Sequence, residues 1–131
     1  MIYNSLSSIT IKIFLYILFL NAGIIISGES DIPSIGKLRS GAEAAFSKGE
    51  IEQSLQLWEQ VIKLEPNNDS NYYKRYRVYL RQQKLKEALS DLNSALKINP
   101  ANENALVQRG KLHMKLGKCL EATNDFQALH G

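Results

Sequence analysis

The sequence of 131 residues has only one cysteine and two histidines. A single cysteine excludes an internal disulfide, and the apolar position of Cys119 in the sequence predicts a small core residue rather than a reactive thiol. Neither His113 nor His130 has a cysteine or carboxylate partner at metal-ligand spacing. We therefore predict no metal site, and we expect His113 to pack against its helical neighbours.

Motifs that carry out chemistry are also missing. The chain has no glycine-rich phosphate loop, no Gly-x-Ser-x-Gly elbow and no His-Glu-x-x-His motif. Its carboxylates are scattered over positions that we expect to lie on the surface. We therefore predict that the protein is not an enzyme and that it binds no cofactor.

Neither sign of charge is in large excess. Sixteen basic and thirteen acidic residues give a net charge of +3, which does not indicate a nucleic-acid partner. Two interpretations of the local basic cluster stay open, namely a solvated helix face and an attractive rim for acidic segments of a partner. The cluster consists of Lys74, Arg75, Arg77, Arg81, Lys84 and Lys86.

A hydrophobic run long enough to span a membrane is missing as well. The almost entirely apolar stretch 13–26 follows Lys12 and is shorter than the roughly 20 residues that cross a hydrocarbon core. No acidic residue precedes Glu29. The pattern predicts a secretory signal peptide over residues 1–28, followed by a linker over residues 29–34. An uncleaved signal anchor is the competing interpretation, and it is the one route by which we expect membrane attachment.

What the chain does contain is an internal repeat, with a period of roughly 34 residues. Pro66 and Pro100 are separated by one such period, and the same step elsewhere joins residues of one kind. Large apolar residues recur at positions 38, 72 and 106 and again at positions 58, 92 and 126. Small residues recur at Ser54, Ala88 and Ala122. This order of large and small residues predicts helix–turn–helix units stacked into a solenoid.

Two apolar stripes run at helical spacing within each unit. Pro66 and Pro100 are expected to end helices, because proline cannot continue a helix and restrains the residue before it. We therefore predict an all-α chain with about three units, at residues 35–68, 69–102 and 103–131. The third unit is expected to be incomplete, since it stops just short of its closing proline.

These positions resemble the tetratricopeptide repeat (TPR) pattern over residues 35–131. The resemblance implies a solenoid that offers a concave surface to a partner. One departure is Tyr76, because the family usually has a small residue there, as at Ala42 and Gly110. The tyrosine either splays the two helices of its unit or turns its ring into the groove.

The first helix of each unit lines the concave face of a TPR solenoid. The resemblance therefore implies an apolar strip edged by basic side chains, which forms adaptable surface for varied apolar ligands. The other interpretation is that several of these side chains simply pack between helices. The residues expected to bind clients are Phe46, Tyr73, Arg77, Leu80, Val107, Lys111 and Met114.

One known use of TPR domains is a clamp on the terminal carboxylate of cytosolic chaperones. That clamp needs asparagines in the first two units and two basic residues in the third. Here Glu43 and Lys74 stand at the asparagine positions, and Asn104 and Gln108 stand at those of the basic pair. A carboxylate at Glu43 would repel such a ligand, so we do not predict this clamp.

Two stretches resemble the second and third repeats of the endoplasmic-reticulum TPR co-chaperone family that carries a C-terminal J domain. The first runs from Tyr72-Tyr73-Lys74-Arg75 through Val78-Tyr79-Leu80 to Lys86-Glu87-Ala88-Leu89-Ser90-Asp91-Leu92. The second comprises Leu106-Val107-Gln108-Arg109-Gly110, Gly117-Lys118, Glu121-Ala122 and Asp125-Phe126.

This second resemblance implies a protein of the endoplasmic-reticulum lumen whose TPR part captures unfolded clients through an apolar groove. The given sequence has no J domain and no His-Pro-Asp triplet, so it is expected to be a fragment or a short isoform. The lumenal chaperone ATPase is then a partner only of a longer form with a J domain. The alternative function is an adaptor for one folded or acidic protein partner.

Asn68-Asp69-Ser70 is an N-glycosylation sequon in the turn between the first two units. In a secreted chain we expect Asn68 to be exposed and open to modification. The alternative is a chance triplet, because such triplets are common and an aspartate in the middle makes the asparagine a poor glycan acceptor.

Overall fold

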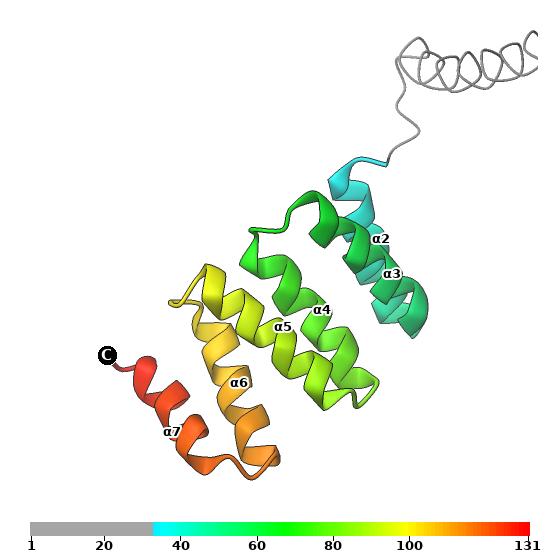
Figure 1. Ribbon diagram of the computed structural model, residues 1–131. Helices are drawn as coiled ribbons and strands as arrows, with labels where there is room; N and C mark the ends of the chain where they lie inside the picture. Colours follow the sequence, from blue (N-terminus) through cyan, green and yellow to red (C-terminus); the bar gives the residue numbers. More distant parts are fainter. Residues whose placement is uncertain (1–32) are drawn as a thin grey trace, which may run out of the picture. The chain divides into compact units, whose positions relative to one another are not determined.

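The computed structural model describes residues 33–131, and these residues form α-helices and no strand (Figure 1). The prediction of an all-α helix–turn–helix solenoid is confirmed. Residues 1–32, which hold the signal peptide and most of the linker predicted above, lie outside the described residues. The helices are α2 (Ile35–Lys48), α3 (Ile51–Leu64), α4 (Asp69–Arg81), α5 (Leu85–Ile98), α6 (Glu103–Lys115) and α7 (Cys119–Ala128).

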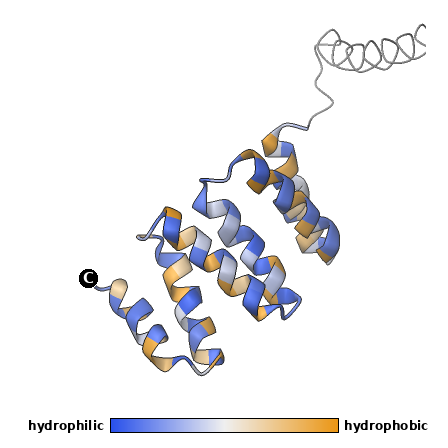
Figure 2. Cartoon of the chain, viewed as in Figure 1, coloured by the Kyte–Doolittle hydropathy of each residue, from blue (hydrophilic) through white to orange (hydrophobic). Residues whose placement is uncertain are grey.

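Consecutive helices pair into hairpins. Helix α2 packs on α3, α4 on α5 and α6 on α7, while contacts from α3 to α4 and from α5 to α6 join one hairpin to the next. Hydrophobic and hydrophilic residues are mixed along the helices (Figure 2). Within residues 33–131, no helix combines the length and the apolar character needed to cross a membrane.

The first helix of each hairpin begins at a polar cap. Ser34, Asn68 and Asn102 lie one repeat length apart, and each side chain accepts a hydrogen bond from a backbone N–H in the first turn of its helix, at 2.9–3.3 Å. Such caps satisfy one of the backbone donors that a helix start leaves without a partner. The sequence repeat therefore fixes where α2, α4 and α6 begin.

The turn inside each hairpin uses one backbone conformation. Gly49, Gln83 and Gly117 are spaced by the same repeat length and have φ angles of 83°, 58° and 74°. Glycine adopts this left-handed region freely, whereas it is uncommon for other residues. The middle hairpin thus makes the same turn as the other two, although it has a glutamine there.

The small residues that recur with the repeat bring the helices of a hairpin together. Ser54 and Ala88 are fully buried and Ala122 is 2% exposed. The hydroxyl of Ser54 donates a hydrogen bond to the carbonyl oxygen of Ala42, at 2.8 Å, so the one polar group among them is satisfied. In the last hairpin the approach is closer still, since a Cβ on Gly110 would lie 2.6 Å from Cε1 of Phe126.

Alanine at Gly110 is expected to destabilise the fold by about 1–3 kcal/mol, because the ring of Phe126 must tilt away and such overpacking usually costs this much. Gly41→Ala is the matched comparison in α2. Its Cβ would meet Leu57 at 3.4 Å, an ordinary contact, so alanine is expected to stabilise by about 0.5–1 kcal/mol. Urea unfolding measures both variants, and equal effects at the two sites would contradict this account of the packing.

The core consists of two apolar clusters. One surrounds Trp58 and joins α2, α3 and α4, and the other surrounds Leu92 and joins α4, α5 and α6. Trp58 is 3% exposed and Leu92 is fully buried. Each cluster therefore binds the second helix of one hairpin to the first helix of the next.

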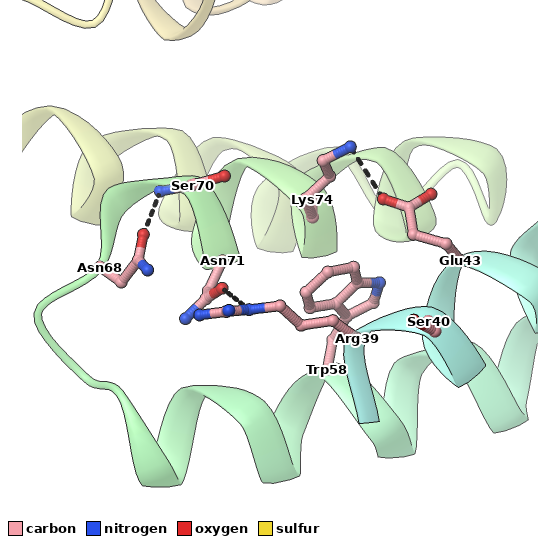
Figure 3. Close-up of a pocket in the computed structure, with 8 residues that line it drawn as sticks. All are labelled: Arg39, Ser40, Glu43, Trp58, Asn68, Ser70, Asn71 and Lys74. Carbon is pink, nitrogen blue, oxygen red and sulfur yellow. Dashed lines mark hydrogen bonds and ion pairs between the residues drawn. The ribbon is translucent and has the colours of Figure 1, made fainter. Parts of the chain in front are cut away.

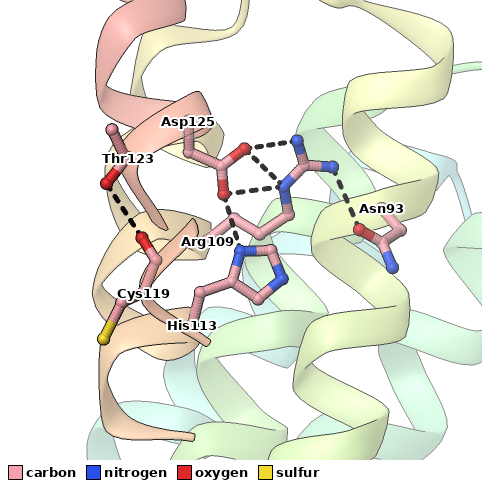
Figure 4. Close-up of polar contacts among 6 residues, drawn as sticks. All are labelled: Asn93, Arg109, His113, Cys119, Thr123 and Asp125. Atoms are coloured by element: carbon pink, nitrogen blue, oxygen red, sulfur yellow. Dashed lines mark hydrogen bonds and ion pairs between the residues drawn. The ribbon is translucent and has the colours of Figure 1, made fainter. Parts of the chain in front are cut away.

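Two carboxylates occupy the core, so the prediction that the acidic residues lie on the surface is wrong for Asp91 and Asp125. They are 2% and 3% exposed. Arg75 donates hydrogen bonds to both oxygens of Asp91, at 2.9 and 2.7 Å, and Arg109 donates to both oxygens of Asp125, at 2.5–3.1 Å (Figure 4). A buried carboxylate is tolerated only when it is paired like this.

The Asp125 pair extends to a histidine. Nδ1 of His113 lies 2.9 Å from Oδ2 of Asp125, and the guanidinium of Arg109 also donates to Oδ1 of Asn93 (Figure 4). His113 is 8% exposed, so it packs in the fold as expected. It has a carboxylate neighbour, however, which the sequence analysis did not identify.

The prediction that Cys119 is a core residue is wrong, because this residue is exposed. It is the first residue of α7. Ile51 and Leu85 begin α3 and α5 and pack against the two core clusters. A cysteine side chain is too short to make the same contact from that position.

Candidate protein-binding groove

Helices α2, α4 and α6 share one hollow on the protein surface, which we call the central hollow. Aromatic, apolar and basic side chains form its wall, and most of them come from α4. The lining residues are Phe46 from α2, Tyr73, Tyr76, Arg77, Leu80 and Arg81 from α4, and Gln108 from α6.

Two arginines lie against the one aromatic ring that α2 contributes. The guanidinium carbons of Arg77 and Arg81 are 4.9 and 5.1 Å from the centre of the Phe46 ring. Arg81 also donates a hydrogen bond to the carbonyl oxygen of Phe46, at 3.2 Å. These contacts hold the two arginines in place at the edge of an apolar surface.

Tyr76 forms the wall between α4 and α6. Its side chain is 4% exposed, its hydroxyl donates to Oε1 of Gln108 at 3.2 Å, and its ring centre is 5.5 Å from that of Tyr73. Burial raises the pKa of the Tyr76 hydroxyl. The ring is therefore buried between α4 and α6, where it belongs to the Leu92 cluster and forms part of the wall of the hollow.

A second hollow continues from the first between α4 and α6, and we call it the α6-side hollow. Its wall combines apolar side chains with two exposed lysines, Lys111 and Lys115. The complete lining is Tyr76, Leu80, Gln108, Lys111, Leu112 and Lys115.

A third hollow, which we call the polar hollow, lies between α2 and α4 (Figure 3). It is lined by Arg39, Ser40, Glu43, Trp58, Asn68, Ser70, Asn71 and Lys74. We refer to the three hollows together as the groove. Oε1 of Glu43 is 2.8 Å from Nζ of Lys74, and Oε2 is 3.6 Å from Nη1 of Arg77. The carboxylate of α2 therefore sits between two cations of α4.

Glu65 holds together three of the residues that line the polar hollow. Its carboxylate accepts hydrogen bonds from the side-chain amides of Asn68 and Asn71 and forms an ion pair with Arg39. The hydrogen bonds of Asn68 and then Asn71, together with Arg39, lower the pKa of Glu65. Asn68 is half-buried and caps α4, so its side chain is less open than the sequon suggested, and its glycosylation stays a prediction.

The structure brings together most of the residues expected to bind clients. Phe46, Tyr73, Arg77 and Leu80 line the central hollow, and Lys111 lines the α6-side hollow. Val107 is half-buried, Met114 is 60% exposed, and neither lines these two hollows. The sequence left the orientation of Tyr76 open, and Gln108 was not among the residues expected to bind clients, although the hydrogen bond between the two closes the wall.

The described residues contain no group of three or more histidine, cysteine, aspartate or glutamate side chains that could hold a metal ion. The arrangement instead offers extended apolar surface, fixed guanidinium groups and lysines to another molecule. Such a mixed surface suits a polypeptide segment.

Comparisons with known proteins agree with this geometry. A family model described as TPR repeat matches residues 77–117. The tetratricopeptide repeat and J domain-containing co-chaperone DNJ1 of Cryptococcus neoformans var. grubii is 31% identical over 75 residues, which are 57% of this chain. The chain spans 14% of the length of this curated relative.

Solved structures with the same fold include the TPR domain of P58(IPK), with a TM-score of 0.70 and 29% identity over 73% of this chain and 27% of that one. The second TPR domain of Spaghetti (RPAP3), bound to the HSP90 peptide SRMEEVD, has a TM-score of 0.66 and 26% identity. That likeness covers 72% of this chain and 87% of the other.

The fold, the groove and the matching family model define the class: the chain is a tetratricopeptide-repeat protein, a helical scaffold for protein–protein interaction, and no catalytic family is indicated. Within this class it resembles the TPR and J-domain co-chaperones and is homologous to one of them.

Proposed function

We propose that the chain binds unfolded or misfolded polypeptide clients as the TPR part of a co-chaperone. The observation that carries this proposal is the central hollow, where aromatic and apolar side chains from α2 and α4 remain partly open to solvent. Leu80 is 36% exposed, and Phe46 and Tyr73 are half-buried. Folded proteins bury most such surface, so a contiguous patch of it suits exposed apolar segments of a client.

Tyr73→Ala combined with Leu80→Ser is expected to weaken capture of a denatured model protein while helicity is retained. Loss of two large apolar contacts should cost about 2–4 kcal/mol of binding free energy, by the transfer values of such side chains. Suppression of light scattering from an aggregating denatured client measures the effect, and circular dichroism checks the fold.

Leu64→Ser with Leu120→Ser is the matched control, because these leucines are 55% and 73% exposed and line none of the three hollows. This control should suppress aggregation as well as the wild type. Equal loss in both double variants, or no suppression by the wild type, would exclude client capture in the groove.

An adaptor for an acidic partner is the second candidate, favoured by Arg77, Arg81 and Lys111 beside the hollows. Salt separates the two, because the Debye length falls from about 8 Å at physiological ionic strength to about 3 Å at 1 M. Capture of an apolar client should persist or strengthen at high salt. Binding that disappears at high salt would favour the adaptor.

The site of action that we propose is the lumen of the endoplasmic reticulum. The support is the apolar run that precedes the described residues and the likeness to a J-domain co-chaperone. Translation with microsomes should give a protease-protected product with a new N-terminus near Glu29. A full-length, protease-sensitive product would exclude this location. The lumenal chaperone ATPase is a partner of any longer form that carries a J domain.

A further inference from the structure

The carboxylate of Glu43 crosses from α2 to α4 and contacts the groove's cations. Its two oxygens lie 2.8 Å from Lys74 and 3.6 Å from Arg77. The three side chains are 36–38% exposed, but Oε1 of Glu43 is itself closed off from solvent and makes no hydrogen bond of good geometry. The contact is therefore an ion pair that water screens only in part.

This internal carboxylate changes what the α2–α4 part of the groove can bind. Lys74 lines the polar hollow and Arg77 lines the central hollow, and the carboxylate of Glu43 offsets part of their charge. A ligand carboxylate that approached them would meet Glu43 at close range, and like charges in contact disfavour a partner. A neutral apolar segment meets no such penalty.

Arg39, the other cation that lines the polar hollow, is paired with Glu65, and the remaining cations of the groove lie farther along it. Arg81 is bound to the ring and the carbonyl of Phe46, and Lys111 and Lys115 lie on α6. The groove therefore has an end where an internal carboxylate offsets part of the positive charge and an end whose cations have no such carboxylate among the lining residues. A peptide with several carboxylates therefore meets a repelling carboxylate at one of the two ends.

We propose that Glu43 is a specificity-determining residue that occupies Lys74 and Arg77, excludes segments with clustered carboxylates and selects neutral apolar segments. This inference rests on the proposed function, since it assigns the ligand class of the same groove. It also predicts that the chain does not bind the peptide SRMEEVD as the second TPR domain of Spaghetti does.

The test is a calorimetric titration of the full chain with two peptides, SRMEEVD and a neutral apolar peptide of equal length. Glu43→Gln should strengthen binding of SRMEEVD about tenfold at low salt, the size of effect expected when about 1.4 kcal/mol of repulsion is removed. The gain should shrink as salt rises. Binding of the neutral peptide should stay within about twofold of the wild type, because a neutral ligand does not feel the lost charge.

Three variants make the test specific. Glu59→Gln removes the same charge from an exposed position on α3 and should produce no gain. Glu43→Asp keeps the charge and should reject SRMEEVD as the wild type does. Adding Lys74→Ala and Arg77→Ala to Glu43→Gln should abolish the gain, because the released cations are then absent.

The outcomes separate this inference from the proposed function. No gain in Glu43→Gln, or an equal gain in Glu59→Gln, overturns the role of Glu43 whatever the neutral peptide does. If Glu43→Gln loses helicity, Glu43→Ala replaces it, and a failure of that variant to bind SRMEEVD more tightly also overturns the role. If the wild-type chain does not bind the neutral peptide, the proposed function is contradicted. A higher affinity of Glu43→Gln for SRMEEVD would still support the role of Glu43.

Discussion

Trp58→Ala is expected to lower the free energy of unfolding by about 3–5 kcal/mol, the usual cost of replacing a core tryptophan by alanine. Trp58 is 3% exposed and lies in the cluster that joins α2, α3 and α4, with Leu38 and Val78 among its members. The side chain thus holds two hairpins together, and its loss leaves a cavity that both hairpins line. Because a domain of this size has a total stability of about 5–15 kcal/mol, the variant should lose a large share of its stability.

Urea unfolding followed by circular dichroism measures this loss. Leu64→Ala is the control on the same helix, because Leu64 is 55% exposed, and it should change stability by less than about 0.5 kcal/mol. A Trp58→Ala variant that is no less stable than this control would mean that the junction between the first two hairpins does not depend on this cluster.

Arg75→Met is expected to destabilise the fold by about 3–5 kcal/mol at neutral pH, because it leaves a buried carboxylate without its partner. The carboxylate of Asp91 is 4% exposed and the side chain of Arg75 is 18% exposed. Replacing both residues, as in Arg75→Met with Asp91→Leu, should restore most of the loss. The first hairpin shows that the fold does not require such an ion pair, since it has Gly41 and Leu57 at the equivalent positions.

The pH dependence of the Arg75→Met variant follows from Asp91. Burial raises the pKa of Asp91, although Arg75 opposes the rise. Because the pKa of Asp91 is higher in the folded than in the unfolded state, protonation of Asp91 stabilises the fold. This stabilisation is complete below the unfolded pKa of about 3.9 and is lost as the pH rises through the folded pKa. The cost of Arg75→Met should therefore shrink as pH falls from 7 toward 4. A cost that is constant over this range, or a double variant as unstable as the single one, would contradict this explanation.

The internal repeat predicted the fold because it records contacts that recur in each hairpin. Ser54, Ala88 and Ala122 are buried as their size indicated, since only small side chains fit where two helices approach closely. Gln83 also has the backbone conformation of Gly49 and Gly117, because the neighbouring helices fix the turn whether or not the residue is glycine.

Other features depend on partners that a single position does not reveal. Asp91 and Asp125 are buried because an arginine lies 16 residues earlier in each case. The two pairs are themselves separated by one repeat length, and this spacing was the signal in the sequence that could have identified them. Tyr76 could not be placed either, since its orientation depends on Gln108 of another hairpin.

The groove was only partly predictable. Helical phase places Met114 on the same stripe as Phe46 and Leu80, but Met114 does not line the central or the α6-side hollow. Phase gives the direction of a side chain from its own helix, whereas a hollow depends on how neighbouring helices approach. Glu43 illustrates the same point, because its contacts with Lys74 and Arg77 cross from α2 to α4.

The most direct test of the central claim is to record the backbone amide NMR spectrum of the chain while an unlabelled, denatured apolar polypeptide is added. We expect the largest changes at residues that line the central hollow, namely Phe46, Tyr73, Leu80 and Gln108. Changes confined to α3, α5 and α7 would contradict binding in the groove. So would an unchanged spectrum at a client concentration at which the chain suppresses aggregation.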